Sequence, residues 1–120
     1  MDKTIFVAEI NESIANFLSI QKGIKIFRSK GLLAHLINRK HYAATKYLDY
    51  LSDIIRFPDY AGTYKGQIEF VKRFKENIFV SVKLDKGKNT YYVATLFDVK
   101  EAKILAYCKS GRLRKVKTEG

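Results

Sequence analysis

The sequence has very little cysteine, and it has no apolar stretch long enough to cross a membrane. Its single cysteine, Cys108, has no partner for an internal disulfide and belongs to no zinc-ligand spacing. Nothing approaches the roughly 20 consecutive apolar residues of a membrane-spanning helix. The N-terminal stretch MDKTIFVAEINESIANF has acids at positions 2, 9 and 12 and no uninterrupted apolar run, so it does not resemble a secretory signal. These absences predict a cytoplasmic protein with no membrane partner.

Acidic residues are scarce relative to basic ones. The 120 residues include 23 Lys and Arg against 12 Asp and Glu, which gives a formal net charge of +11. An excess of this size attracts polyanions and speeds their encounter with the protein. The charge therefore favours nucleic acid as the partner, while an acidic protein partner or a charge that serves solubility alone stay open.

Three signatures of phosphate and metal chemistry are missing from the sequence. It has no glycine loop to cradle phosphates, no dinucleotide-binding fingerprint and no cluster of carboxylates for Mg²⁺. Any cleavage of nucleic acid would then proceed without a metal, and we expect no cofactor. RNA suits such chemistry best, because its own 2′-hydroxyl supplies the nucleophile.

Apolar residues are plentiful enough for one core. They make up 47% of the chain, and we expect a single domain spanning residues 1–120. The first half of the chain mostly has the apolar spacing of helices, ended by Pro58. Asn11 or Ser13 suits the first helix as its N-cap. Helices are predicted at 11–20, 30–40 and 42–57, with short strands at 4–10 and 23–28.

Residues 58–66, with two glycines and the only proline, are predicted as a loop, and from residue 67 onward the spacing becomes that of strands. Three runs rich in β-branched and aromatic residues, at 67–74, 78–84 and 90–97, are joined by hairpin-length connections. A short helix is predicted at 100–110, and Gly111 is suited to end it in a left-handed conformation. Helices followed by an antiparallel meander and a final helix predict an α+β fold, with the helices against one sheet face.

Alternation within these strands predicts one polar sheet face. In the middle strand Ser81 and Lys83 point away from the apolar set. If the strands pair in the expected register, this face carries Glu69, Ser81, Lys83, Tyr91, Val93 and Thr95. The ordinary solvent-facing side of an antiparallel sheet is the other interpretation of this face. Four tyrosines, at 60, 64, 91 and 92, lie in or beside the loops and the sheet. Interleaved with lysine, such rings can stack unpaired bases, each worth roughly 1–3 kcal/mol, and half-buried core is the other interpretation.

Both histidines lie in the segment AHLINRKHY. His35 and Arg39 are one helical turn apart, so they project from the same face, and His41 follows at the helix end. An imidazole can act as general base and then general acid, and the planar fork of an arginine can hold a phosphate. Packing of His35 beside Leu36 is the alternative. Two histidines without acidic ligands do not predict a metal site.

The stretch CKSGRLRKVK near the C-terminus has five cationic side chains and no acid. The hydroxyl of Ser110 beside the guanidinium of Arg112 is suited to gripping a phosphate. If the chain is extended after Gly111, Arg112 and Arg114 share a face and Lys115 lies on the other. A solvated, disordered tail is the alternative.

Several blocks of the sequence together resemble a known family. In order they are SKGLLAHLINRKHY, YLDYLSDIIRFPDYAG, IEFVKRFKENIFVSVKLD, YYVATLFDVKEAKI and SGRLRKV. They resemble the phage-associated nuclease-like domains called PBECR, grouped with barnase, EndoU, nuclease colicins and RelE. The likeness covers about residues 3–116. It implies a BECR-type RNase fold, with helices on one face of an antiparallel sheet of about four strands and the site on the other side.

The resemblance also implies metal-independent RNA cleavage that leaves a 2′,3′-cyclic phosphate. His35 would be general base or acid, and Lys83 and Arg112 would stabilise the pentavalent phosphate. Thr95 and Ser110 would donate hydrogen bonds to phosphate oxygens. The remaining residues of the predicted RNA-binding set are Arg39, His41, Tyr91, Arg114 and Lys115.

The predicted biological role is a prophage toxin or effector. An acidic antitoxin or immunity protein is then an expected partner, because an active RNase endangers its host. Two other functions stay open: a non-catalytic nucleic-acid-binding module, and a phage structural or interaction protein.

Overall fold

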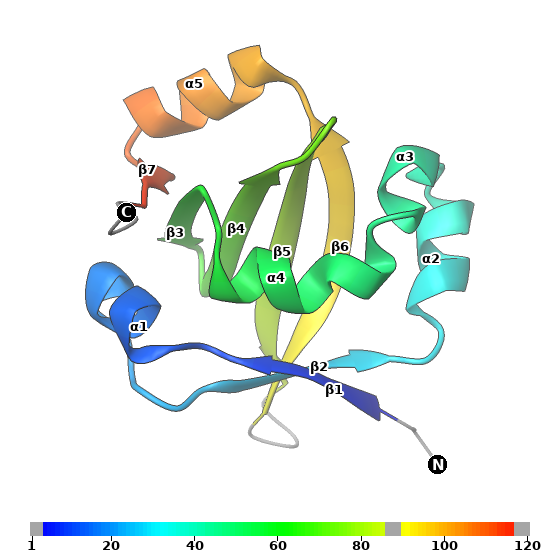
Figure 1. The fold of residues 1–120 in the computed structure, drawn as a ribbon, viewed down its shortest axis with the longest axis horizontal. Helices are drawn as coiled ribbons and strands as arrows, with labels where there is room; N and C mark the ends of the chain where they lie inside the picture. The colour runs from blue at the N-terminus through cyan, green and yellow to red at the C-terminus, as the bar shows by residue number, and fades with distance from the viewer. Residues whose placement is uncertain (1–3, 86–89, 117–120) are drawn as a thin grey trace.

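The computed structural model describes residues 4–85 and 90–116, which form a mixed α and β fold (Figure 1). Within these residues the strands are β1 (Thr4–Glu9), β2 (Lys25–Ser29), β3 (Tyr60–Tyr64), β4 (Gln67–Arg73), β5 (Asn77–Asp85), β6 (Thr90–Val99) and β7 (Arg114–Lys115). The helices are α1 (Glu12–Leu18), α2 (Leu32–Asn38), α3 (Tyr42–Thr45), the 3₁₀ turn η1 (Leu48–Tyr50), α4 (Leu51–Arg56) and α5 (Glu101–Lys109). The predicted α+β class is confirmed.

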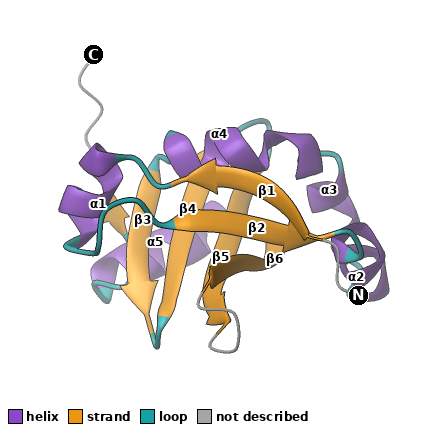
Figure 2. Ribbon diagram, turned by 90° about the horizontal axis from the view of Figure 1, so that it is seen from below, coloured by secondary structure: helices purple, strands orange, loops and turns teal. Residues whose placement is uncertain are grey.

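All of these strands join one sheet, in the order β1-β2-β6-β5-β4-β3-β7. Neighbours are antiparallel except β2 and β6, which pair in parallel. The prediction of about four strands is wrong, because this sheet contains seven within the described residues. The antiparallel pair β1 and β2, connected through α1, extends it beyond β6 (Figure 2), and β3 and β7 extend it at the other edge. The stretch from Pro58 to Gly66, predicted as a loop, instead contains β3.

The sheet is covered on both faces, so the prediction that N-terminal helices pack against one face of a small sheet is also wrong. On the inner face of β4–β6, which carries Phe70, Val80 and Leu96, the core includes residues of α1, α2 and α4. The outer face carries Phe79, Ser81 and Lys83. Helix α5 covers one end of this outer face, because Ile104 of the helix and Leu113, which comes after the helix, pack on Phe79. Figure 1 shows α4 in front of the sheet and α5 at its upper end.

The helix predicted over 42–57 is broken into α3, η1 and α4. The N–H of Tyr47 bonds to Ala44 O and the N–H of Tyr50 to Tyr47 O, which is the tighter spacing of 3₁₀ turns. This turn lets the Tyr47 ring point inward, where its hydroxyl donates to Glu76 at 2.9 Å. The chain still leaves the helical conformation just before Pro58, as predicted.

Two predicted helix ends are confirmed. The Asn11 side chain accepts a hydrogen bond from the N–H of Ile14 at 2.8 Å and caps α1. Gly111 follows Ser110, the C-cap of α5, with a φ of +84°, the left-handed conformation that glycine adopts without strain. In the described part of the chain, the helices are too short and too polar for any of them to span a membrane.

Candidate functional site

The outer face of β4, β5 and β6 is organised in three rows of directly paired residues. The apolar row, nearest α5, consists of Val71, Phe79 and Phe97. The polar row consists of Glu69, Ser81 and Thr95. The lysine row consists of Gln67, Lys83 and Tyr92. Successive rows lie roughly 7 Å apart along the strands.

This register confirms that Glu69, Ser81, Lys83 and Thr95 share a face, but Tyr91 and Val93 do not belong to it. Between Ser81 and Val82 the partner on β6 steps from Thr95 to Val93, so β6 has an extra residue there. A bulge of this kind reverses the alternation beyond it. Val93 is therefore buried in the inner core and Tyr91 packs against it, while Tyr92 takes the place beside Lys83.

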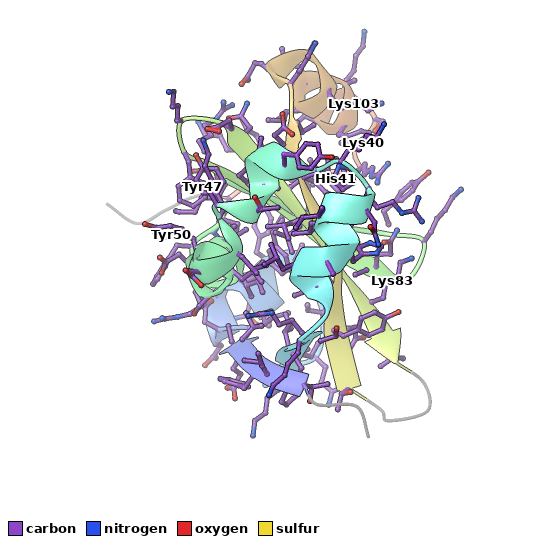
Figure 3. All side chains as sticks on the ribbon, turned by 90° about the vertical axis from the view of Figure 1, so that its right-hand side faces the viewer. Lys40, His41, Tyr47, Tyr50, Lys83 and Lys103 are labelled. Carbon is purple, nitrogen blue, oxygen red and sulfur yellow. The ribbon has the colours of Figure 1, made fainter. Side chains whose placement is uncertain are left out.

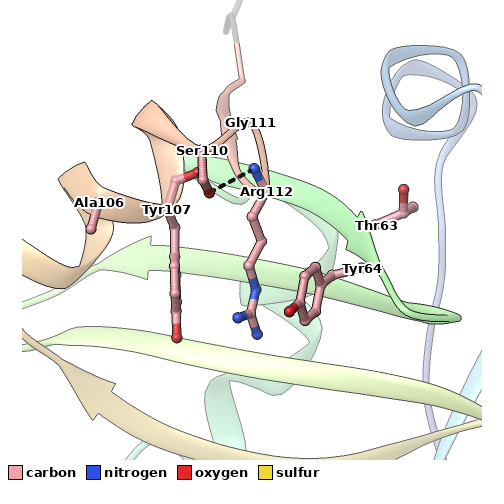
Figure 4. Close-up of a pocket in the computed structure, with 7 residues that line it drawn as sticks. All are labelled: Thr63, Tyr64, Ala106, Tyr107, Ser110, Gly111 and Arg112. Atoms are coloured by element: carbon pink, nitrogen blue, oxygen red, sulfur yellow. Dashed lines mark hydrogen bonds between the residues drawn. The ribbon is translucent and has the colours of Figure 1, made fainter.

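Arg112 is held on the polar row by Glu69, and Figure 4 shows its side chain beside those of Tyr64 and Tyr107. Its Nε donates to Glu69 Oε1 at 2.7 Å and its Nη2 to Oε2 at 2.6 Å. The guanidinium also lies between two aromatic rings, 3.9 Å from the Tyr64 centroid and 4.1 Å from that of Tyr107. Glu69 is only 1% exposed. The hydrogen bond to Glu69 raises the pKa of Arg112 above its ordinary value. The cation is therefore permanent and fixed in position.

The Arg112 side chain borders an open groove of about 520 Å³. Its lining residues are Thr63, Tyr64, Ala106, Tyr107, Ser110, Gly111 and Arg112. The Ser110 hydroxyl donates to Tyr107 O at 3.0 Å and accepts from the Arg112 N–H at 3.4 Å. A further cation, Lys103, lies 5.3 Å from the Tyr107 ring. The groove thus has a guanidinium and a hydroxyl in its lining, with a lysine close to one of its two tyrosines, which suits an anionic ligand with an aromatic part.

His41 lies at the other side of the outer face. It precedes α3, is half-buried, and its ring centroid is 5.4 Å from that of Phe97 in the apolar row. Phe97 in turn stacks on Phe79 at 4.9 Å. Figure 3 shows His41 and Lys83 from the side of α2. The ring that His41 contacts, Phe97, is one row from Thr95 on β6, and β5 separates it from Glu69 and its partner Arg112.

His35, the predicted general base or acid, lies on α2, and Arg39, the predicted phosphate ligand, follows that helix. His35 and Arg39 are both exposed, while Leu32 and Leu36 of the same helix are buried. Within the described residues, neither the His35 nor the Arg39 side chain forms a hydrogen bond or ion pair with the polar row or with Arg112. Of the two histidines, His41 has a ring contact with the outer face, at Phe97. Thr95 and Lys83 share that face, and Ser110 and Arg112 line the groove.

Arg114 and Lys115 do not join Arg112. The Arg114 guanidinium donates to Phe17 O at 2.9 Å and lies 4.5 Å from the Phe17 ring, against α1. The prediction that Arg112 and Arg114 share a face is wrong. Leu113, which lies between them, is 1% exposed, and the regular alternation of a strand starts only after it, at β7. Lys115 is exposed on this edge strand and pairs with Tyr60.

Sequence reasoning placed Glu69 on the right face and included Tyr64 among the tyrosines that could stack bases. It missed the pairing of Glu69 with Arg112, and it missed Tyr107. A sequence signal for Glu69 does exist, because an acid between the apolar residues of QIEFV is buried, and buried carboxylates are paired. Its partner, 43 positions away, is fixed only by the fold. Among residues 4–85 and 90–116, no three His, Cys, Asp or Glu side chains are grouped as metal ligands.

The sequence was compared with known families, curated proteins and solved structures. A family model described as phage-Barnase-EndoU-ColicinE5/D-RelE like nuclease 3, PBECR3, matches residues 5–106. No curated protein and no solved structure matches the chain. The matched region includes every strand of the polar row and ends before Arg112. Because this match covers most of the 120 residues, the chain belongs to the PBECR3 family of phage-type nuclease domains.

Proposed function

We propose that this nuclease domain cleaves RNA without a metal ion, with Arg112 holding the phosphate that is cut. The observation that carries the proposal is the fixed guanidinium between Tyr64 and Tyr107, at the border of an open groove. Glu69 engages only two of its five N–H donors, so the others can bind phosphate oxygens. A preorganised cation of this kind stabilises the charge that develops in a transition state.

The reaction that fits is attack by the neighbouring 2′-hydroxyl. The 2′-oxygen forms a bond to phosphorus as the bond to the 5′-oxygen breaks, which leaves a 2′,3′-cyclic phosphate and a free 5′-hydroxyl. His41 accepts the 2′-hydroxyl proton, and the leaving oxygen takes a proton from solvent in the open groove. Arg112 stabilises the pentavalent phosphate.

The remaining polar groups have supporting roles in this proposal. The hydroxyls of Thr95, in the polar row, and Ser110, in the groove, donate to phosphate oxygens. Lys83 is one row further along the same face, so we assign it to a neighbouring phosphate. Arg39, exposed after α2, would hold a phosphate more distant from the cut. RNA is preferred over DNA because only RNA has its own nucleophile, and the described residues offer no group of metal ligands to supply another.

The decisive experiment is an RNA cleavage assay in EDTA with identification of the product ends. We expect 2′,3′-cyclic phosphate and 5′-hydroxyl ends. The matched control is the same oligonucleotide with one deoxyribose at the cleaved position, which should resist the enzyme there. RNA that stays intact but is shifted on a gel would show a binding module and overturn the catalytic proposal.

We also infer a toxin role, with an acidic protein as inhibitor. The formal net charge of +11 and the basic groove favour such a partner. Induced expression in a bacterial host should arrest growth, and His41→Gln should relieve the arrest at equal protein level. Growth arrest by both proteins would contradict a toxic activity that depends on cleavage.

A further inference from the structure

The lysine row continues beyond Lys83 into a strip of aromatic side chains that crosses the end of the sheet. Tyr92 on β6 pairs with Phe27 on the parallel neighbour β2, and Phe27 pairs with Phe6 on β1. Directly paired residues on neighbouring strands project from the same face. Figure 2 shows β1, β2 and β6 side by side. Tyr92, Phe27 and Phe6, called the aromatic strip below, therefore lie on the same face as Lys83.

The aromatic strip is exposed, although other aromatic rings of this protein are buried in its core. Phe6 is 54% exposed and Tyr92 37%, with Phe27 half-buried between them. Phe6 and Phe27 meet edge to face, with ring centroids 5.6 Å apart. Three aromatic residues left in one exposed row indicate a binding surface rather than scattered surface apolar residues.

The charges around the strip favour nucleic acid over an apolar protein surface. Lys83 continues the strip on one side, and exposed Lys25 lies on the same face of β2, two residues before Phe27. Among the side chains that the structure describes, the acid Glu9 is opposite Lys25 on β1. Aromatic rings interleaved with lysines are the surface on which unpaired bases stack while phosphates meet cations. The strip is also one row from the polar row that carries the proposed cut.

We propose that the aromatic strip binds the unpaired RNA segment that flanks the cleaved phosphodiester. Bases stack on Tyr92, Phe27 and Phe6, and Lys83 pairs with the phosphate between the cut and the first stacked base. From Lys83 to Phe6 the row crosses three strand spacings, roughly 15 Å, which is enough for a short single-stranded segment. This inference rests on the proposed function for the identity of the ligand.

The test is the binding of a fluorescein-labelled, uniformly 2′-O-methylated oligonucleotide, which the proposed reaction cannot cut, measured by anisotropy in EDTA. Phe6→Ala and Tyr92→Ala should each weaken binding roughly 5- to 100-fold, the loss typical of one base–aromatic stack. Tyr92→Phe keeps the ring and should bind like the unmodified protein. A duplex of the same sequence should bind more weakly, because its bases are already stacked.

Phe57 provides a matched control. It is 53% exposed, nearly the same as Phe6, but it follows α4 on the inner side of the sheet. Phe57→Ala should leave oligonucleotide binding unchanged. Equal affinities of Phe6→Ala, Tyr92→Ala and Phe57→Ala, or no binding by the unmodified protein, would overturn the inference.

The same set of proteins separates this inference from the proposed function. If the unmodified protein cuts ordinary RNA while strip variants bind and cut equally well, the strip proposal fails and the nuclease proposal stands. If the unmodified protein cuts nothing, yet strip variants lose affinity for the methylated RNA, the reverse holds.

Discussion

Arg112 and Glu69 form an ion pair whose two members differ in exposure. The Glu69 side chain is 1% exposed and that of Arg112 20%. Removing the arginine alone leaves a buried carboxylate without its counter-charge, whereas removing both charges leaves two neutral groups. A lost activity after a single substitution of Arg112 would therefore mix a structural with a catalytic effect, and the two need separate variants.

We predict that Arg112→Gln lowers the free energy of unfolding at neutral pH by about 3 kcal/mol, the cost of a broken buried pair. The double variant Glu69→Gln/Arg112→Gln should regain most of that loss, because no buried charge remains, and should still fail to cleave RNA. Urea denaturation and the cleavage assay measure the two effects. If the double variant is as unstable as Arg112→Gln, the unpaired carboxylate of Glu69 is not the cause of the lost stability.

The two histidines give the sharpest test of the catalytic assignment. We expect His41→Gln to reduce kcat by ~10²–10⁴-fold, the usual contribution of a general base, with little change in the free energy of unfolding. His35→Gln serves as the control and should change kcat very little, since His35 is exposed on α2. A large loss with His35→Gln and none with His41→Gln would restore the assignment made from the sequence.

Sequence spacing could not rank these histidines. A helical turn places His35 with Arg39, but the face of α2 that meets the sheet is set by the burial of Leu32 and Leu36. His41 reaches the outer face only because the chain turns after α2 and the imidazole packs on Phe97. Contacts between segments this far apart depend on strand order, which no local pattern contains.

At the scale of elements, β3 brings the Arg112 segment against the sheet, and Gly62 permits the close approach. A Cβ at this position would lie 1.9 Å from Arg112 O, a backbone atom that cannot easily move. The sequence predicted a loop here because PDYAGTYKG contains two glycines and the only proline. The strand forms because it pairs with β4 over its whole length.

We therefore expect Gly62→Ala to destabilise the fold by about 3 kcal/mol, at the upper end of the cost of overpacking. It should also reduce cleavage, because the displaced backbone carries Arg112. Thr63→Ala, at the exposed next position, is the control and should have little effect on stability. Thermal unfolding and the RNA assay measure both, and a fully stable Gly62→Ala would mean that the segment moves aside freely.

The attachment of α5 to the outer face depends on pH. Glu101 in its first turn accepts from Arg73 Nη2 on β4 at 2.8 Å, and this hydrogen bond holds the pKa of Glu101 below its ordinary value. A carboxyl with a lowered pKa in the folded state stabilises the fold above its ordinary pKa of 4.5, and this contribution is lost as the pH falls through the lowered value.

Glu101→Gln should accordingly reduce the loss of stability on acidification. Urea midpoints at about pH 6 and about pH 3.5 are expected to differ less in this variant than in the unmodified protein. Glu76, whose pKa is lowered by Lys46, acts in the same direction, so Glu76→Gln is a second comparison. An unchanged pH dependence in Glu101→Gln would mean that the contact to Arg73 does not persist in solution.

The register of β6 shows how far sequence alternation reaches. The run TYYVATLF fits strand spacing whether Tyr91 or Tyr92 faces outward. Alternation from Thr95 alone selects Tyr91, but the bulge near Ala94 reverses it and exposes Tyr92. Whether a bulge forms depends on pairing with β5 and β2 together, so the strand was predictable and its outer residues were not.

At the scale of the whole molecule, several acids already neutralise particular cations. Within the described residues Glu12, Glu69, Glu76 and Glu101 pair with Lys22, Arg112, Lys46 and Arg73. These four pairs remove equal numbers of both signs, so the formal excess of +11 is carried by the other basic residues. Such an excess attracts RNA from a distance, and its effect is weakened by salt.

The salt dependence of RNA binding can therefore separate a direct phosphate contact from general attraction. For single strands, the slope of log affinity against log salt falls in magnitude by about 0.7 for each phosphate contact removed. Lys83→Gln should show this reduction with the methylated oligonucleotide. Lys22→Gln changes the net charge equally, but Lys22 already pairs with Glu12 in the turn after α1, and its slope should match that of the unmodified protein. Identical slopes for both variants would mean that Lys83 contributes only to the overall charge, and the path of the RNA across the lysine row would then have to be redrawn.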